Sequence, residues 1–232
     1  MPVSYANLTA FVAALAKLVP DMKGGYTEAD FVTDAVTRFS EQIPAELTAD
    51  AGDGSATEFE LGASPFGSFA LGFSEGWPIT VERLTSGNVA MNPAEAWGEK
   101  VRIDKRAVAG VPKLYLVFPS APPAAGKARV HFSAPWTVST TVDLPAAYHT
   151  AVVKKAGALK CRALALFYAQ TIDPSGGSDI FDARQYADAY AKRADELEED
   201  FDRIVAGAGE APGMSFGRAR SRIPRVFAPW GS

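Results

Sequence analysis

The chain has 232 residues, of which 47% are hydrophobic and 22% are charged, and its formal net charge is −4. These values lie in the ordinary range for globular proteins, and the length allows one or two domains with a sizeable core. No apolar stretch approaches the roughly 20 residues of a membrane span, and the N-terminus lacks a signal-peptide pattern. We therefore expect a protein that stays in the cytoplasm where it is made. The single cysteine, Cys161, excludes an intramolecular disulfide and a cysteine-based zinc site.

Two amphipathic helices are predicted at the start of the chain. Apolar residues recur at spacings of three and four from Asn7 to Val19, and Pro20 ends this pattern. Thr27 and Asp30 have the spacing of a capping box, with Asp in place of the usual Glu. They predict the start of a second helix, which Pro44 ends.

The character of the sequence changes after the second predicted helix. Glycine and proline recur every few residues, and the runs between them are short and rich in β-branched or aromatic residues, as in a small antiparallel sandwich or barrel. Asp53-Gly54 predicts a hairpin that joins residues 46–49 to residues 57–61. The further predicted strands are residues 80–84, 100–103, 113–118 and 128–132.

Two longer helices are predicted after the β region. Asp143 and Pro145 are suited to the first turn of a helix that continues to about residue 171. A fourth helix runs from about residue 178 to residue 206, with Leu197 and Phe201 on a heptad-like apolar seam. These spacings place both side chains in a helical core.

The predicted fold is therefore α+β, with three parts. Residues 1–44 and 143–206 form a four-helix bundle, and residues 45–142 form an antiparallel β domain, a sandwich or barrel, inserted between the second and third helices. Residues 207–232 form an extended C-terminal tail without helical periodicity.

No set of residues typical of a catalytic or metal site is found. Neither His131 nor His149 has an acidic or cysteine partner at ligand spacing. Nucleotide-binding, hydrolase and zinc-protease motifs do not occur. We therefore expect a protein that is not an enzyme, with no catalytic residue, no metal and no cofactor.

A short stretch of the fourth predicted helix is strongly acidic. Because its acids surround Leu197 and Phe201 on a helix whose other face is apolar, a solvated face is the first interpretation, with Glu199 and Arg203 in a favourable i,i+4 order. The alternative is a polar contact with a neighbouring subunit or a channel surface. The acids are Asp195, Glu196, Glu198, Glu199, Asp200 and Asp202.

The tail combines glycine and proline with arginine and aromatic residues, and it contains no acid after Glu210. A basic tail on an acidic body predicts binding to a negatively charged surface, and arginine and aromatic residues often anchor interfaces. We expect the tail to be disordered in the free subunit and ordered in an assembly. The predicted interface residues are Phe216, Arg218, Arg220, Arg222, Arg225, Phe227 and Trp230.

Four tryptophans leave a second class of function open. Tryptophans on a β-sandwich can stack sugars, although packing in a core or an interface is the commoner use. A carbohydrate- or host-surface-binding module is therefore the alternative to an assembly protein. The tryptophans are Trp77, Trp97, Trp136 and Trp230.

The layout resembles the head-to-tail adaptor proteins (connector, or head completion, proteins) of tailed bacteriophages and related gene transfer agents. The resemblance covers roughly residues 27–206, and the N-terminal predicted helix departs from it. The residues that carry it are Phe31 to Ser40, Gly52 to Gly54 with Glu58 to Leu61, Val130 to Trp136, Leu144 to Tyr148, Ala163 to Ala169 and Ala187 to Tyr190.

This resemblance implies a virion structural protein of the neck, assembled in the host cytoplasm. Such a subunit docks in a ring, usually a dodecamer, beneath the portal protein, extends the DNA channel and presents the attachment site for a tail or tail-completion protein. Its partners would be the portal, neighbouring adaptor subunits and the tail; packaged DNA would pass without specific binding, and no membrane would be involved. A ring templated by the portal predicts a free chain that is monomeric.

Overall fold

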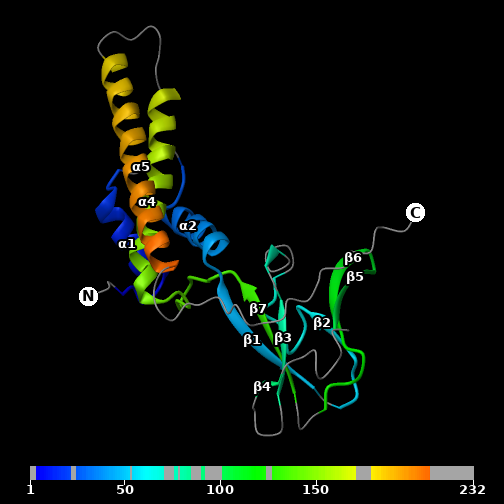
Figure 1. Cartoon of the computed structure of the whole chain (residues 1–232). Coiled ribbons are helices and arrows are strands. Elements are labelled where there is room, and N and C mark those ends of the chain that lie inside the picture. The colour runs from blue at the N-terminus through cyan, green and yellow to red at the C-terminus, as the bar shows by residue number, and fades with distance from the viewer. Residues whose placement is uncertain are drawn as a thin grey trace. The chain divides into compact units, whose positions relative to one another are not determined.

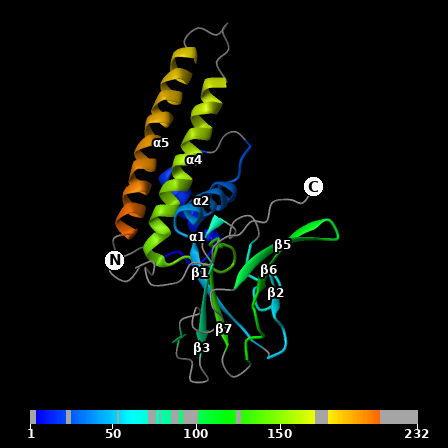
Figure 2. The ribbon, with the colours of Figure 1, turned by 45° about the vertical axis from the view of Figure 1, so that its right-hand side comes forward.

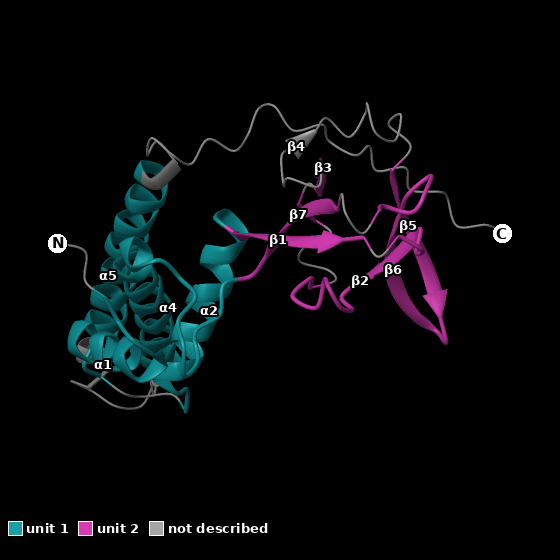
Figure 3. Ribbon diagram, turned by 90° about the horizontal axis from the view of Figure 1, so that it is seen from below, with its two compact units in different colours: residues 1–43, 136–214 teal, residues 44–135, 215–232 magenta. Residues whose placement is uncertain are grey.

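The computed structural model describes residues 4–21, 25–52, 54–70, 76–77, 79–84, 90–91, 101–123, 127–170 and 179–209 (Figure 1). Over these residues the fold is mixed α and β, with four α-helices and two small antiparallel sheets. The chain divides into a helical unit, formed before residue 44 and after residue 135, and a β unit between them (Figure 3). No helix within the described ranges is both long enough and apolar enough to cross a membrane.

The helical unit begins with α1 (Leu8–Leu18) and α2 (Glu28–Gln42), and the predicted capping box of α2 is confirmed. The Asn7 side chain accepts a hydrogen bond from the backbone N–H of Ala10 at 3.0 Å. Thr27 and Asp30 form the predicted capping box, in which each side chain binds the other residue's backbone N–H. These local bonds satisfy N–H groups that have no partner inside the helix.

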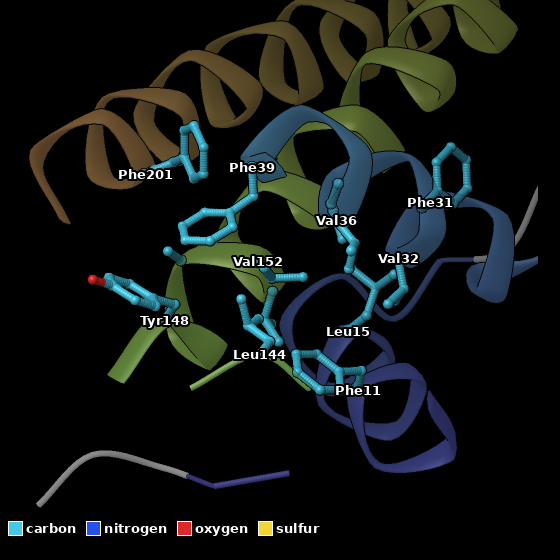
Figure 4. Packing of buried hydrophobic residues seen from close by; sticks show 14 residues of the cluster. Phe11, Leu15, Phe31, Val32, Val36, Phe39, Leu144, Tyr148, Val152 and Phe201 are labelled. Atoms are coloured by element: carbon cyan, nitrogen blue, oxygen red, sulfur yellow. The ribbon is translucent and has the colours of Figure 1, made fainter. Parts of the chain in front are cut away.

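The other two helices are α4 (His149–Gln170) and α5 (Asp179–Gly209), which lie side by side and antiparallel (Figures 1 and 2). α4 contacts α1, α2 and α5, and its first half is buried by them. Phe11, Val32, Phe39 and Phe201 converge on α4 to form the core of the unit (Figure 4).

The start of α4 differs from the predicted cap at Asp143. A 3₁₀ turn, η2 (Ala146–Tyr148), precedes the helix, and the Asp143 carboxylate accepts a hydrogen bond from the Thr137 hydroxyl. His149 is 3% exposed; its Nδ1 accepts the Tyr5 N–H and its Nε2 lies 2.8 Å from the Leu144 carbonyl oxygen. With Nε2–H donating, this neutral histidine holds the segment before α1 against the start of α4.

The helical unit resumes at Trp136, earlier than the predicted residue 143. The Trp136 backbone N–H donates to the hydroxyl of Ser40, and its indole N–H donates to the Ile43 carbonyl at 2.7 Å. Both acceptors belong to the end of α2. Trp136 is therefore an anchor in the helical unit and not part of the β unit.

The β unit contains two small antiparallel sheets. The first has the strand order β1-β7-β3-β4, and the second has the order β2-β6-β5. The strands are β1 (Ala45–Ala51), β2 (Glu58–Leu61), β3 (Thr80–Leu84), β4 (Ala90–Met91), β5 (Arg102–Val108), β6 (Val111–Val117) and β7 (Ala128–Ala134). Among the described strands the sheets do not close into a barrel.

The predicted hairpin through Asp53-Gly54 is wrong. β1 pairs with β7 along its whole length, from Ala45 opposite Ala134 to Ala51 opposite Ala128, while β2 pairs with β6 in the other sheet. Alternating polarity identified both segments as strands, but it does not select the partner, and a seven-residue ladder to the buried strand β7 satisfies more backbone groups than a short local hairpin.

The tight hairpin that the structure does contain joins β5 to β6 through Ala109 and Gly110. These residues have positive φ values of 52° and 80°, as in a type I′ turn. Sequence inspection ended the strand at residue 103 and missed this hairpin, because Ala-Gly is a weaker turn signal than Asn-Gly or Asp-Gly. In Figure 2 the hairpin stands out at one side of its sheet.

Leu197 and Phe201 are both fully buried, as the apolar spacing of α5 predicts. Phe201 packs edge-on against Phe39, with ring centroids 6.5 Å apart. Phe201→Ala should lower the free energy of unfolding by about 3–5 kcal/mol, because it leaves a cavity in the core. Glu199→Ala, on the exposed side of the same helix, should change it by less than about 0.5 kcal/mol. Urea denaturation measures both; the opposite ranking would show that the buried face of α5 is assigned wrongly.

Candidate assembly surface

The acidic stretch of α5 lies beside a row of cations, most of which come from α4. Lys154 pairs with Asp200 at 2.6 Å, and Lys155 forms a short ion pair with Glu198. Hydrogen bonding to Lys154 is the main reason that the pKa of the Asp200 carboxyl is below its ordinary value. Part of the predicted acidic surface is thus the seam that holds α4 and α5 together.

The remaining acids are divided between paired and outward-facing groups. Glu196 pairs with Arg193 at 3.0 Å on α5 itself, and Asp195 lies 3.8 Å from Arg162 of α4. Both acids are mostly exposed, so these contacts contribute little to stability. Arg203 pairs with Asp200 at 3.0 Å, and not with Glu199 as its i,i+4 spacing suggested.

Glu199 and Asp202 are the acids of this stretch that face outward without an ion pair to any described residue. They lie three positions apart and therefore on the same side of α5. They are the part of the predicted acidic surface that is free to meet another molecule.

Lys155 occupies an unusual position for a cation. Its side chain is 9% exposed and its Nζ lies 5.0 Å from the centre of the Phe201 ring, while Glu198 supplies the counter-charge. The second oxygen of Glu198 is also buried and has Arg162 at 3.5 Å. Glu198 is therefore a structural partner of a buried lysine, and the expectation that all these acids are solvated is wrong for this residue.

A second buried cation, Lys160, joins three helices. Its side chain is 2% exposed, and its Nζ donates to the Val19 carbonyl at 2.6 Å and to the Glu28 carboxylate at 2.7 Å. The Val19 carbonyl, at the C-cap of α1, thereby gains a hydrogen-bond donor, and Glu28 is the first residue of α2. Sequence inspection missed this role, although Lys160 stands one helical turn after the buried Ala156 on an apolar face.

The β unit carries a polar cluster that sequence inspection also missed. On the outer face of the first sheet, His131 of β7 lies between Thr48 and Thr80 in the strand register, and its Nε2 is 3.1 Å from Glu82 of β3. These residues come from three strands, so their proximity depends on the pairing. A histidine–carboxylate pair can transfer a proton, but this one lies on a sheet face and not among converging catalytic groups.

Beside this histidine, Arg129 forms a two-pronged contact with Asp50, with N–O distances of 2.9 and 3.3 Å. The hydrogen bonds to Arg129 are the main cause of the lowered pKa of the Asp50 carboxyl. The pair links β1 to β7 across the sheet. Within the described ranges, no group of three or more His, Cys, Asp or Glu side chains is arranged to hold a metal ion.

The predicted tail interface lies outside the described residues. This applies to Phe216, Arg218, Arg220, Arg222, Arg225, Phe227 and Trp230. Trp97 lies outside them as well, and Trp77 is half-buried in the segment before β3.

No protein-family model matches the chain, and no curated protein matches its sequence.

Lys160→Met keeps an unbranched side chain but removes the ammonium group. Because Glu28 and the Val19 carbonyl then lose their buried donor, we expect the free energy of unfolding to fall by about 3–5 kcal/mol. Adding Glu28→Gln removes the uncompensated carboxylate and should restore part of the loss. Chemical denaturation of the single and double variants measures this coupling; a single variant as stable as the parent would contradict it.

Asp50→Asn tests the link between β1 and β7. Since the pKa of Asp50 is lowered in the folded chain from 3.8, its stabilisation is complete above that pH and is lost as the pH falls through the lowered value. We expect the variant to lose about 1 kcal/mol or less at neutral pH, because the pair is partly exposed. This difference should shrink in acid. Glu46→Gln, at an exposed position of the same strand, is the matched control for the substitution, and thermal melts of the parent and both variants across the acid range are the measurement.

Proposed function

We propose that this chain is a structural head-to-tail adaptor of a tailed bacteriophage. It docks as a ring under the portal, extends the DNA channel and provides the attachment site for the tail. Its partners are the portal protein, neighbouring copies in a ring that is a dodecamer when it matches the portal, and a tail or tail-completion protein. It acts in the neck of the virion and is assembled in the host cytoplasm, without enzymatic activity.

The observation that most supports an assembly role is the position of the exposed apolar side chains. Val108 and Val111 lie at the turn of the β5–β6 hairpin, and Leu166 and Tyr186 lie on the α4–α5 pair. Large apolar side chains at protruding places favour contact with other proteins. We propose that the four helices form a bundle with an inserted β domain and that this architecture presents the exposed side chains.

The charges of the helical unit support a channel through which DNA passes without binding. Lys154 and Lys155 are engaged by acids of α5, so they are not free to hold phosphates. Glu199 and Asp202 face outward, and we propose them as the channel surface or as partners for the arginines of a neighbouring tail. Like charges would let DNA slide past such a surface.

The alternative, a carbohydrate- or host-surface-binding module, has weaker support. It requires an aromatic platform on the β unit, but the indole of Trp136 is bound to α2 in the helical unit. The polar cluster around His131 contains hydrogen-bonding groups, but the Nε2 atom of His131 is buried and does not reach the surface where a sugar would bind. A glycan array distinguishes the two functions, because the adaptor proposal expects no binding.

An antibody to this chain should label the junction between head and tail in purified particles. Heads assembled without the chain should lose their DNA and carry no tails, because the ring seals the channel and receives the tail. Electron microscopy of labelled and chain-deficient particles is the measurement. Label at the distal end of the tail would favour the surface-binding alternative, and absence of the chain from particles would contradict both.

The free chain should be a monomer of 24.6 kDa in light scattering, since the portal is needed to bring copies together. Replacing the four tail arginines by serine should leave this monomer folded and reduce its attachment to particles. The matched control is Arg38→Ser, an exposed position on α2, which should attach normally. If the tail variant attaches to particles as well as the parent chain, the tail arginines are not part of the interface.

A further inference from the structure

The turn of the β5–β6 hairpin is an exposed surface without charge. All six residues from Ala107 to Pro112, which we call the hairpin tip, are exposed. Val108 is 42% exposed, and Val111, directly opposite it in the strand register, is 55% exposed. Ala109 and Gly110 close the turn with positive φ values. The tip is thus a small aliphatic protrusion whose shape is fixed before any partner binds.

The cations that border the tip are already neutralised. In the cross-strand pair before it, Arg106 binds Glu58 at 2.7 Å and Lys113 binds Glu60 at 2.8 Å. Nucleic acids and anionic membranes require free cations, and membrane-inserting segments use larger side chains such as Trp, Phe and Leu. The chemistry of the tip therefore fits an uncharged protein surface.

A surface of this kind is present on α4. From Ala163 to Gln170 the helix has no charged residue, and α4 with α5 extends beyond α1 and α2 (Figures 1 and 2). Leu166 is 58% exposed, and Ala169 and Gln170, one turn further, are also exposed. We call these three residues the α4 patch. A helix that is apolar on several sides is normally covered by a partner.

We propose that the hairpin tip of one copy packs against the α4 patch of the next copy. This inference rests on the proposed function, because a closed ring is built from a heterologous contact between two different patches of the same chain. The tip is aliphatic and exposed, and Ala169, one turn after Leu166, is a small exposed residue on the same side of the helix. Neither surface brings an unpaired charge into the contact.

The small size of the two surfaces sets the strength of the contact. A stable interface buries roughly 1,200–2,000 Å² in total, and a six-residue turn on one helical patch supplies only part of that. The contact is therefore too weak to keep free chains associated, although a disulfide can trap its transient encounters at high protein concentration, and it becomes stable when the portal fixes many copies side by side. This agrees with a chain that is monomeric before assembly.

Mixing two variants that each carry one introduced cysteine tests the contact directly. One chain carries Val111→Cys, and the other carries Leu166→Cys and a purification tag, so that each disulfide-linked product has its own mass. The native Cys161 is fully buried, and burial raises its thiol pKa to about 11, so it does not compete. Thr37→Cys, at an exposed position of α2, replaces Leu166→Cys in the control mixture. Both mixtures are oxidised with oxidised glutathione at high protein concentration.

We expect the disulfide between residues 111 and 166 to form several-fold more than the 111–37 product and more than either symmetric product. Equal yields in the two mixtures would overturn the contact. In a second experiment, Val108→Thr with Val111→Thr keeps the β-branched shape of the tip and should reduce incorporation into particles several-fold without changing the monomer's melting temperature. Full incorporation of that variant would also overturn the contact.

The two proposals fail in different ways. If the 111–166 disulfide is enriched but the parent chain is absent from particles, the contact stands and the adaptor function is wrong. If the parent chain labels the head–tail junction but the disulfide is not enriched, the adaptor function stands and the contact is wrong.

Discussion

A single buried ammonium group, Lys160, fixes how the helices of the first unit meet. Lys160 lies in the middle of α4. Its ammonium group donates hydrogen bonds to the Val19 carbonyl at the end of α1 and to the Glu28 carboxylate at the start of α2. Burying a charge is costly unless its hydrogen bonds are satisfied, so alternative positions of α1 or α2 would leave it uncompensated. The backbone around it is equally constrained. A Cβ on Gly157 would approach Leu18 Cδ2 to 2.9 Å and Leu197 Cδ1 to 3.1 Å, so α1 and α5 pack closely on α4 only because a glycine stands there.

Lysines of α4 are likewise paired with acids along the contact between α4 and α5. Lys155 lies under Phe201 and is compensated by Glu198, and Lys154 reaches Asp200. Because Lys154 and Lys155 of α4 are used to join the two helices, they are not available to a partner, whereas Glu199 and Asp202 of α5 face outward. An internal structural requirement thereby determines which surfaces remain for partners, and these surfaces suit protein contacts better than nucleic-acid binding.

The β unit shows the same separation between a structural interior and a surface with specific chemistry. Val130 and Phe132 of β7 face the core, while Arg129 and His131 lie on the opposite face at alternate positions of the same strand. In the second sheet, Glu58, Glu60, Arg106 and Lys113 neutralise one another beside the uncharged hairpin tip. The exposed apolar turn is thus flanked by charges that are already compensated within the sheet.

Local patterns in the sequence were sufficient for the features that depend on neighbouring residues. The Thr27–Asp30 capping box and the buried face through Leu197 and Phe201 follow from spacings of three and four, because helical hydrogen bonds and side-chain contacts are local. The α+β character and the absence of a long apolar helix among the described residues belong to the same class of inference.

Only the tertiary structure decided which distant segments meet. β1 joins β7, and not β2, because strand pairing is set by burial and by the length of the ladder across the whole chain. The His131–Glu82 pair and the buried partners of Lys155 and Lys160 depend on that long-range packing, which spacing along the chain does not contain. The sequence therefore specified the helices, the capping box of α2 and the alternation of the strands, whereas the fold determined which charges pair inside and which surfaces are left for other molecules.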